Sequence, residues 1–179
     1  MENKSQYFET NPIIAAVKDE QQLECAINSS CGIIFFLFGN ICNIKDMVDK
    51  AKNAGKLTFV HLDLTQGLSG KEIAVDFVKQ FVGADGVIST KVNVIKLARE
   101  QGLFTVQRFF IVDSHSLATT IDSVRSSKPD MIEIMPGTLP KVVEKLKKSI
   151  DVPIIAGGLI ETEAEVLDML RSGACIGFR

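Results

Sequence analysis

The stretch Val152-Pro153-Ile154-Ile155-Ala156-Gly157-Gly158-Leu159-Ile160 contains a buried strand that breaks into paired glycines. Shortly after it, Glu161-Thr162-Glu163 predicts the start of a helix. Glycines at such a turn let backbone N–H groups approach an anion closely, and the helix N-terminus adds a positive dipole. The glycines therefore indicate a phosphate site, although a tight strand-to-helix turn explains the same residues and stays open as the alternative.

Outward from this stretch, short apolar runs alternate with longer amphipathic segments along the whole chain. We expect strands at Ile13–Val17, Ile33–Phe38, Leu57–Leu62, Gly86–Ser89, Phe104–Val112, Met131–Met135, Pro153–Ala156 and Ala174–Phe178. The segments between them have helical spacing. In one of them Ile73, Phe77 and Phe81 recur at i, i+4 and i+8, which predicts an apolar stripe facing a sheet.

This alternation, with near-continuous apolar strands, predicts parallel pairing covered by helices. Seven complete βα units followed by an eighth strand favour a closed barrel, so the expected fold class is α/β, a short TIM-barrel-like (β/α) barrel. In such barrels the loop after the seventh strand commonly forms half of a phosphate site, which favours that interpretation of Gly157 and Gly158. Because the sequence stops at Arg179, we expect the eighth helix to be missing.

Length and composition predict one domain spanning residues 1–179. A hydrophobic content of 46% and a mean hydropathy of +0.19 exclude a disordered chain. The N-terminus shows no secretory signal, and the longest apolar stretch, Ile33–Gly39, is too short to cross a bilayer. The four cysteines lack C-x-x-C spacing, which is typical of reduced thiols. We therefore expect a cytoplasmic protein with no membrane partner.

The charge of the chain provides no general attraction for nucleic acid. The formal net charge is −2, with a pI near 5.7, so any such binding must use a local patch. One local basic stripe is formed by Lys141, Lys145, Lys147 and Lys148. A solvated helix face explains this stripe, and contact with an RNA backbone is the alternative.

Polar residues within apolar strands report the barrel interior, because alternate side chains of a strand share a face. Phe59, His61 and Asp63 share one face, which places Asp63 at the C-terminal mouth, where barrel active sites lie. His61 lies one layer deeper and is interpreted as a core histidine. Glu133 falls between two methionines on its face, so its carboxyl needs a partner or a raised pKa.

Three cations are candidates for the same mouth. Lys18 and Lys91 each follow the end of a strand, where they could start a solvated helix or meet an anion. Within Gln107-Arg108 one side chain points inward and the other outward, and the sequence does not decide which; an arginine there needs an acid or a phosphate as partner.

Other chemistry is poorly supported by the sequence. No Ser-His-Asp signature or Gly-x-Ser-x-Gly motif is present, and His61 with Asp63 makes a poor metal site, so we expect no metal and no cofactor. The loop Thr65–Gly70 could act as a flexible lid; the default alternative is that Ser69 or Gly70 is a plain helix-capping residue.

Several of these stretches together resemble the glycerol uptake operon antiterminator family, the glycerol-3-phosphate-responsive regulators. The matching stretches are Asn11–Val17, Val60–Leu68, Gly86–Lys91, Gln107–Ser114, Glu133–Gly137 and Ile155–Ile160. The resemblance implies a TIM-barrel-like, ligand-gated RNA-binding regulator, not an enzyme, that binds glycerol 3-phosphate and acts on leader mRNA to prevent premature termination of glycerol-utilisation transcripts. Whether it forms a homo-oligomer stays open.

The resemblance also assigns roles to residues. Gly157 and Gly158 would hold the phosphate. Residues lining the mouth would contact the phosphate or the glycerol hydroxyls: Asp63, Glu133, Arg108 and Lys91, with Lys18 as a further cation. The chain departs from a typical second phosphate loop after strand eight, where it has Cys175-Ile176-Gly177-Phe178-Arg179 and stops. Gly177 as a backbone donor, or Arg179 as a counterion, would be the replacement.

Two other functions stay open on the sequence. The first is a phosphate-handling barrel enzyme of the isomerase or aldolase type, with Glu133 or Asp63 as base and Lys91 as electrostatic stabiliser or Schiff-base former. The second is a sensor that binds the phosphate but acts through a protein partner.

Overall fold

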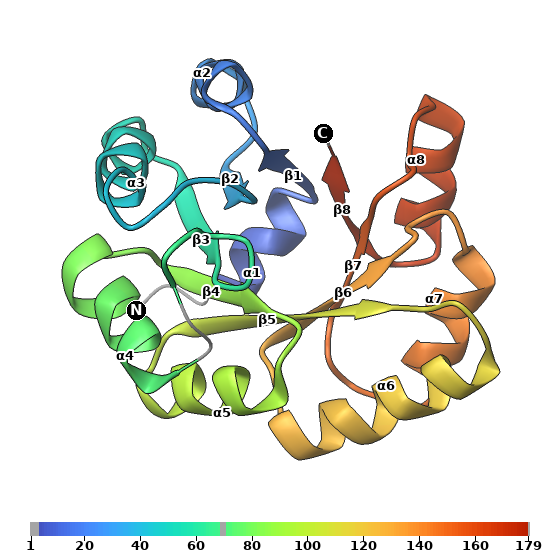
Figure 1. Cartoon of the computed structure of the whole chain (residues 1–179). Coiled ribbons are helices and arrows are strands. Elements are labelled where there is room, and N and C mark those ends of the chain that lie inside the picture. The colour runs from blue at the N-terminus through green and yellow to red at the C-terminus, as the bar shows by residue number, and fades with distance from the viewer. Residues whose placement is uncertain (1–3, 69–70, 179) are drawn as a thin grey trace.

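Eight parallel strands close into a barrel in a computed structural model that describes residues 4–68 and 71–178 (Figure 1). The strands are β1 (Ile13–Val17), β2 (Ile33–Phe36), β3 (Leu57–His61), β4 (Gly86–Ser89), β5 (Phe104–Phe110), β6 (Met131–Met135), β7 (Ile154–Gly157) and β8 (Cys175–Phe178). Each pairs with the next along the chain, and β8 pairs with β1. The predicted TIM-barrel-like fold is confirmed, and every predicted strand end lies within two residues of the observed one.

Helices surround this ring. They are α1 (Lys4–Thr10), α2 (Glu20–Asn28), α3 (Ile44–Asn53), α4 (Glu72–Asp76) with its π-helical continuation η1 (Phe77–Val82), α5 (Val92–Glu100), α6 (Ser114–Ser127), α7 (Pro140–Lys147) and α8 (Glu163–Arg171). The α-helices thus number eight in the described ranges, because α1 precedes β1. The expectation of a missing eighth helix is wrong as a count, although none follows β8 within residues 4–68 and 71–178.

The N-terminal end of the barrel is sealed by α1, which lies across the ring of strands and not in the outer layer (Figure 1). Phe8 is buried, and its ring stacks on Phe104 at 5.5 Å and meets Phe59 edge-on at 5.6 Å. The Cys175 thiol donates to the carbonyl of Phe8 at 3.7 Å, which ties β8 to the same helix. The base of the barrel is therefore an apolar, aromatic plug.

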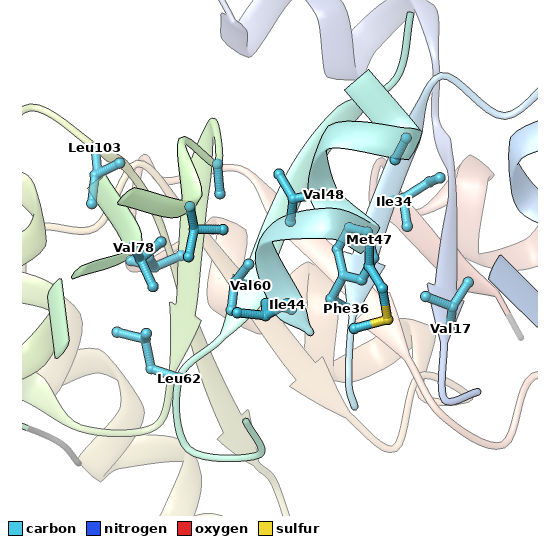
Figure 2. Packing of buried hydrophobic residues seen from close by; sticks show 14 of the residues in the cluster. Val17, Ile34, Phe36, Ile44, Met47, Val48, Val60, Leu62, Val78 and Leu103 are labelled. Carbon is cyan, nitrogen blue, oxygen red and sulfur yellow. The ribbon is translucent and has the colours of Figure 1, made fainter. Parts of the chain in front are cut away.

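The outward faces of the strands form a second apolar layer with the helices. Figure 2 shows this layer on one side of the barrel, where Ile34 and Phe36 of β2 and Val60 of β3 lie beside Met47 and Val48 of α3. On the outside of β1 the cover is thinner, and a groove of about 520 Å³ runs between β1 and α2. No helix of the described chain is both long and apolar enough to cross a bilayer.

Two of the three residues of the predicted apolar stripe of α4 and η1, Ile73 and Phe81, face the solvent, which corrects the expectation that the stripe faces the sheet, whereas Phe77 is partly buried against the core. Ile73 is 68% exposed and Phe81 56% exposed, whereas Val78 and Val82 are buried. Two stripes with four-residue spacing compete in this segment, and the slimmer valines fill the space over the sheet. Phe81 instead stacks on Phe77 at 5.2 Å and carries the Lys45 ammonium over its ring at 5.9 Å.

Replacing the plug should cost far more stability than replacing the exposed stripe. We expect Phe8→Ala to lower the free energy of unfolding by about 3–5 kcal/mol, because it leaves a cavity beside the rings of Phe59 and Phe104. Ile73→Ala is the matched control and should cost under about 1 kcal/mol. Urea unfolding followed by circular dichroism measures both, and equal losses would contradict this account of the base and of α4.

Candidate functional site

A buried ion pair lies inside the barrel towards its C-terminal end. Arg108 and Glu133 are Cα partners across β5 and β6, and the Arg108 Nε–H donates to Glu133 Oε2 at 2.7 Å. Both side chains are buried. Gln107 faces outward instead, and its Oε1 accepts from Ser127 Oγ of α6 at 2.5 Å. The structure therefore settles which side chain of Gln107-Arg108 points into the barrel, and it gives Glu133 the partner that its burial requires.

The ion pair explains a glycine on the neighbouring strand. A Cβ atom on Gly157 would lie 2.5 Å from Glu133 Oε1, closer than carbon and oxygen can approach. Gly177 of β8 pairs with Gly157, but a Cβ there would lie 3.6 Å from the same oxygen, an ordinary van der Waals contact. The carboxylate thus occupies the volume that a side chain on β7 would need. Gly157 lies beside Glu133, as a shared site requires.

Arg108 and Glu133 form a buried polar layer inside the barrel, and His61 also belongs to it. From the sequence alone, His61 is interpreted as a core histidine. It is 2% exposed, and within the described residues its Nδ1 has no hydrogen-bond partner. Burial, followed by the Arg108 charge, lowers the pKa of His61 from 6.5 to about 3. A neutral imidazole with one orphaned nitrogen is poorly satisfied as a core group. The available signal in the sequence was its position on the same interior face as Asp63.

Asp63 lies at the mouth, as predicted, but its carboxylate is engaged by the loop after β4. It accepts from the Thr90 amide at 2.7 Å, from Thr90 Oγ1 at 2.9 Å and from Ser89 Oγ at 3.0 Å. Burial raises the pKa of this carboxyl, but the hydrogen bonds from Thr90 and Ser89 together outweigh burial, so the pKa of Asp63 lies below its ordinary value. Asp63 therefore fixes the β4–α5 loop as an anion.

The two candidate lysines differ in their surroundings. Lys91 Nζ lies 3.8 Å from Asp63 Oδ1, and its side chain is about half exposed, so it stands at the mouth with room to move. Lys18 follows β1 and is exposed; its backbone amide donates to Gln22 Oε1 at 3.0 Å. The structure thus brings Lys91 to Asp63 and Arg108 to Glu133, but does not bring Lys18 into contact with any of them.

The glycine turn after β7 presents free donors. Gly158 has φ +75° and Leu159 φ +60°, both left-handed, and Leu159 is 70% exposed. The Gly158 carbonyl accepts from the Gly137 amide at 2.9 Å, which ties this turn to the loop after β6. Within the described residues, no protein acceptor takes the backbone N–H of Gly158 or of Leu159. Two adjacent unpaired amides are the donor arrangement that binds an anion.

The helix after this turn begins where the sequence predicted, but its own side chains close its end. Thr162 caps α8 by accepting from the Glu165 amide at 3.3 Å, and Glu165 accepts from the amides of Glu161 and Thr162, each at 3.0 Å. Free donors therefore belong to the glycine turn and not to the first turn of α8.

Some predictions concern residues that the structure does not describe. Ser69 and Gly70 of the proposed lid, and Arg179 as counterion, lie outside the described ranges. Gly177 lies within β8, paired with Gly157. Among the described residues no group of three or more histidine, cysteine, aspartate or glutamate side chains could hold a metal ion.

Comparison of the sequence with known proteins finds a matching family. The profile of the family described as "Glycerol-3-phosphate responsive antiterminator" matches residues 13–176. The chain is also 47% identical over 163 residues to the Escherichia coli K12 protein named "Uncharacterized protein YgcP", over 91% of this chain and 85% of that protein.

Two solved structures agree with this match. The glycerol uptake operon antiterminator regulatory protein of Listeria monocytogenes superposes with a TM-score of 0.89 at 32% identity, covering 92% of this chain and 90% of that one. A glycerol uptake operon antiterminator-related protein of Thermotoga maritima superposes with a TM-score of 0.84 at 34% identity, covering 93% of each chain.

Replacing one partner of the buried ion pair should lower the free energy of unfolding more than replacing both partners. Arg108→Met leaves the Glu133 carboxyl buried without its partner, and we expect a loss of about 3–5 kcal/mol in the free energy of unfolding. The double variant Arg108→Met, Glu133→Leu should recover most of that loss, because no buried charge remains. Urea unfolding of the two single variants and the double variant measures the coupling, and additive losses would contradict it.

The neutral state of His61 predicts a pH dependence of stability. Because its pKa is about 3 in the folded chain and 6.5 unfolded, the unfolded chain binds one more proton between these values. The free energy of unfolding should therefore fall as pH drops through this window, by up to about 1.4 kcal/mol per pH unit. His61→Gln should remove that component. His115→Gln, at the other and exposed histidine, is the control and should retain it.

Proposed function

The chain belongs to the glycerol-3-phosphate responsive antiterminator family, and on that premise we propose that it is a glycerol-3-phosphate-responsive, RNA-binding transcription antiterminator of glycerol-utilisation genes. The observation that carries the proposal is the pair of unpaired amides at Gly158 and Leu159 beside a buried polar layer. An anion can accept hydrogen bonds from the two amides, and hydroxyl groups can pair with the buried polar side chains. Glycerol 3-phosphate carries both in one small molecule.

In this proposal the phosphate accepts hydrogen bonds from the glycine turn. The amides of Gly158 and Leu159 supply donors, and Lys91 supplies a mobile positive charge at the rim. Lys18 follows the end of β1 and is exposed, so in this proposal it is a second cation that would move towards the bound anion. Gly158 suits this turn because its φ of +75° lies in the left-handed region that favours glycine.

The glycerol hydroxyls would enter the layer below. A hydroxyl donates one hydrogen bond and accepts others, so it can satisfy groups of both kinds. Glu133 Oε1 can accept, since Oε2 is the oxygen that takes the Arg108 bond. The orphaned Nδ1 of His61 can pair with a further hydroxyl. In this proposal Asp63 does not contact the ligand; it fixes the loop that carries Lys91.

The same groups are poorly suited to the enzymatic alternative. A general base needs a pKa near the working pH. Asp63 has a lowered pKa, and Glu133 is held by Arg108 at 2.7 Å. Lys91 Nζ lies 3.8 Å from a carboxylate and its side chain is about half exposed, whereas Schiff-base lysines are activated by an apolar pocket or a neighbouring cation. These observations support binding without turnover. The metabolite would then act by shifting the population towards the state that engages RNA.

The proposal predicts a ligand-specific response to RNA. In an electrophoretic mobility assay at 150 mM salt, the protein should retard a transcript of the glycerol-operon leader more strongly with glycerol 3-phosphate present, and glycerol should have no such effect. Glycerol 3-phosphate recovered after prolonged incubation should be unchanged by mass spectrometry. Turnover would favour the enzyme instead.

Calorimetry on two lysine variants separates the site from general charge. Lys91→Ala should weaken glycerol 3-phosphate binding by about tenfold, which corresponds to about 1.4 kcal/mol. Lys96→Ala removes an exposed lysine of the same helix, α5, and should leave the affinity within twofold. Similar affinities of the wild-type protein for glycerol and glycerol 3-phosphate would show that the glycines are only turn residues.

A further inference from the structure

The cations of this chain fall into two groups on the described surface. Apart from Lys91, which lies beside Asp63 at the mouth, and Arg125, which is described below, six surface cations are tied to acceptors: Lys45 to Asp49, Lys50 to Glu24, Lys52 and Lys56 to backbone carbonyls, Lys79 to the Gln101 carbonyl, and Arg171 to Asp168. Five of these six lie on α3, on η1 or just after α3. A lysine already paired has little to offer a new anion, so the remaining cations are the ones of interest.

Within the described residues, the cations without a hydrogen-bond or ion-pair partner lie around α6 and α7, apart from Lys18, Lys71 and Lys96. We name as the α6–α7 flank the exposed residues Arg99, Arg125, Lys128, Lys141, Lys145 and Lys148. Within the described residues, the only ion pair among them joins Arg125 to Asp122 at 3.8 Å, with both side chains largely exposed. Residues 125–148 contain six lysines and arginines against three acids, and one of those acids is the buried Glu133, whereas the whole chain has a net charge of −2.

Two clefts mark the ends of this flank. Near the mouth, Lys141 and Lys145 line a cleft of about 220 Å³ whose walls include Val112 and Leu139, which are 82% and 40% exposed. At the opposite end of the barrel, Arg99, Arg125 and Lys128 line a cleft of about 530 Å³, together with Asp151 and with Asp130, whose carboxylate already accepts from Thr105. Lys141, Lys145 and Lys148 have i, i+4, i+7 spacing, so they form a row along one side of α7 from the first cleft towards the second.

We propose that the α6–α7 flank binds the phosphate backbone of single-stranded RNA, an inference that rests on the function proposed above. The lysine row and the basic cleft supply the charge that a phosphate backbone needs. The exposed walls of the upper cleft, Val112 and Leu139, offer an apolar surface to an unstacked base, which a single strand can turn outward and a duplex cannot.

The position of the upper cleft connects it to the ligand layer. Val112 follows β5 and Leu139 follows β6, the two strands that carry Arg108 and Glu133. The Ile111 amide donates to the Met135 carbonyl at 2.8 Å, so the two chain segments leave the barrel bound together. A metabolite that shifts β5 relative to β6 would therefore change the cleft directly.

The test measures binding of a fluorescein-labelled glycerol-operon leader transcript by anisotropy, with glycerol 3-phosphate, between 50 and 300 mM salt. The α7 variant combines Lys141→Ala, Lys145→Ala and Lys148→Ala. It should bind the transcript at least tenfold more weakly. The slope of log K against log salt concentration should fall by about 2, because about 0.7 counterions are released per single-strand phosphate contact. The control, Lys45→Ala, Lys50→Ala and Lys52→Ala combined, removes the same charge from α3 and should stay within twofold.

A second variant, expected to gain RNA affinity, distinguishes a loss of contacts from a loss of folding in the first variant. Glu144 is an exposed acid within the lysine row, so Glu144→Gln should strengthen RNA binding severalfold. If the wild-type protein binds RNA but the α7 variant behaves like the α3 control, or Glu144→Gln brings no gain, the flank is not the RNA surface and the proposed function survives. If the wild-type protein binds no RNA with or without the metabolite, the proposed function fails and this inference with it.

Discussion

The buried pair of Arg108 and Glu133 is the constraint around which the mouth of this barrel is organised. Two charges removed from water are tolerable only when they meet each other with good geometry, which the opposed positions on β5 and β6 provide. Their presence then limits their neighbours. Gly157 must lack a side chain to leave room for the carboxylate, and His61 must stay neutral beside the guanidinium. A polar layer with unused hydrogen-bonding capacity is the result.

The two ends of the barrel consequently differ in character. The base is closed by the aromatic contacts of Phe8, which fill the interior with apolar volume and leave no room for a ligand. The other end keeps its polar layer and is framed by loops that are bound to one another. Asp63 holds the loop after β4, and Gly137 holds the turn after β7 through the carbonyl of Gly158. The closed base and the linked loops therefore leave the polar layer as the part of the described barrel interior with unused hydrogen-bonding groups.

The sequence predicted the closed barrel because apolar runs that alternate with helical segments leave few other arrangements. It also placed Asp63 at the mouth and Glu133 inside from period-two counting alone. The pattern could not choose between Gln107 and Arg108, since adjacent residues of a strand face opposite ways and only the register with β6 decides. Nor could it show that Ile73 faces solvent, because two stripes of equal spacing compete there. Such choices depend on contacts between distant segments.

The depressed basicity of His61 has a consequence for the charge of this layer. Because the pKa of its imidazole is about 3, His61 stays neutral at pH values near 7. The net charge of the buried layer therefore does not change through that residue in this range. In the function proposed above, any change of ligand affinity with acidity would come from the phosphate ester, whose second ionisation lies near pH 6, and not from His61.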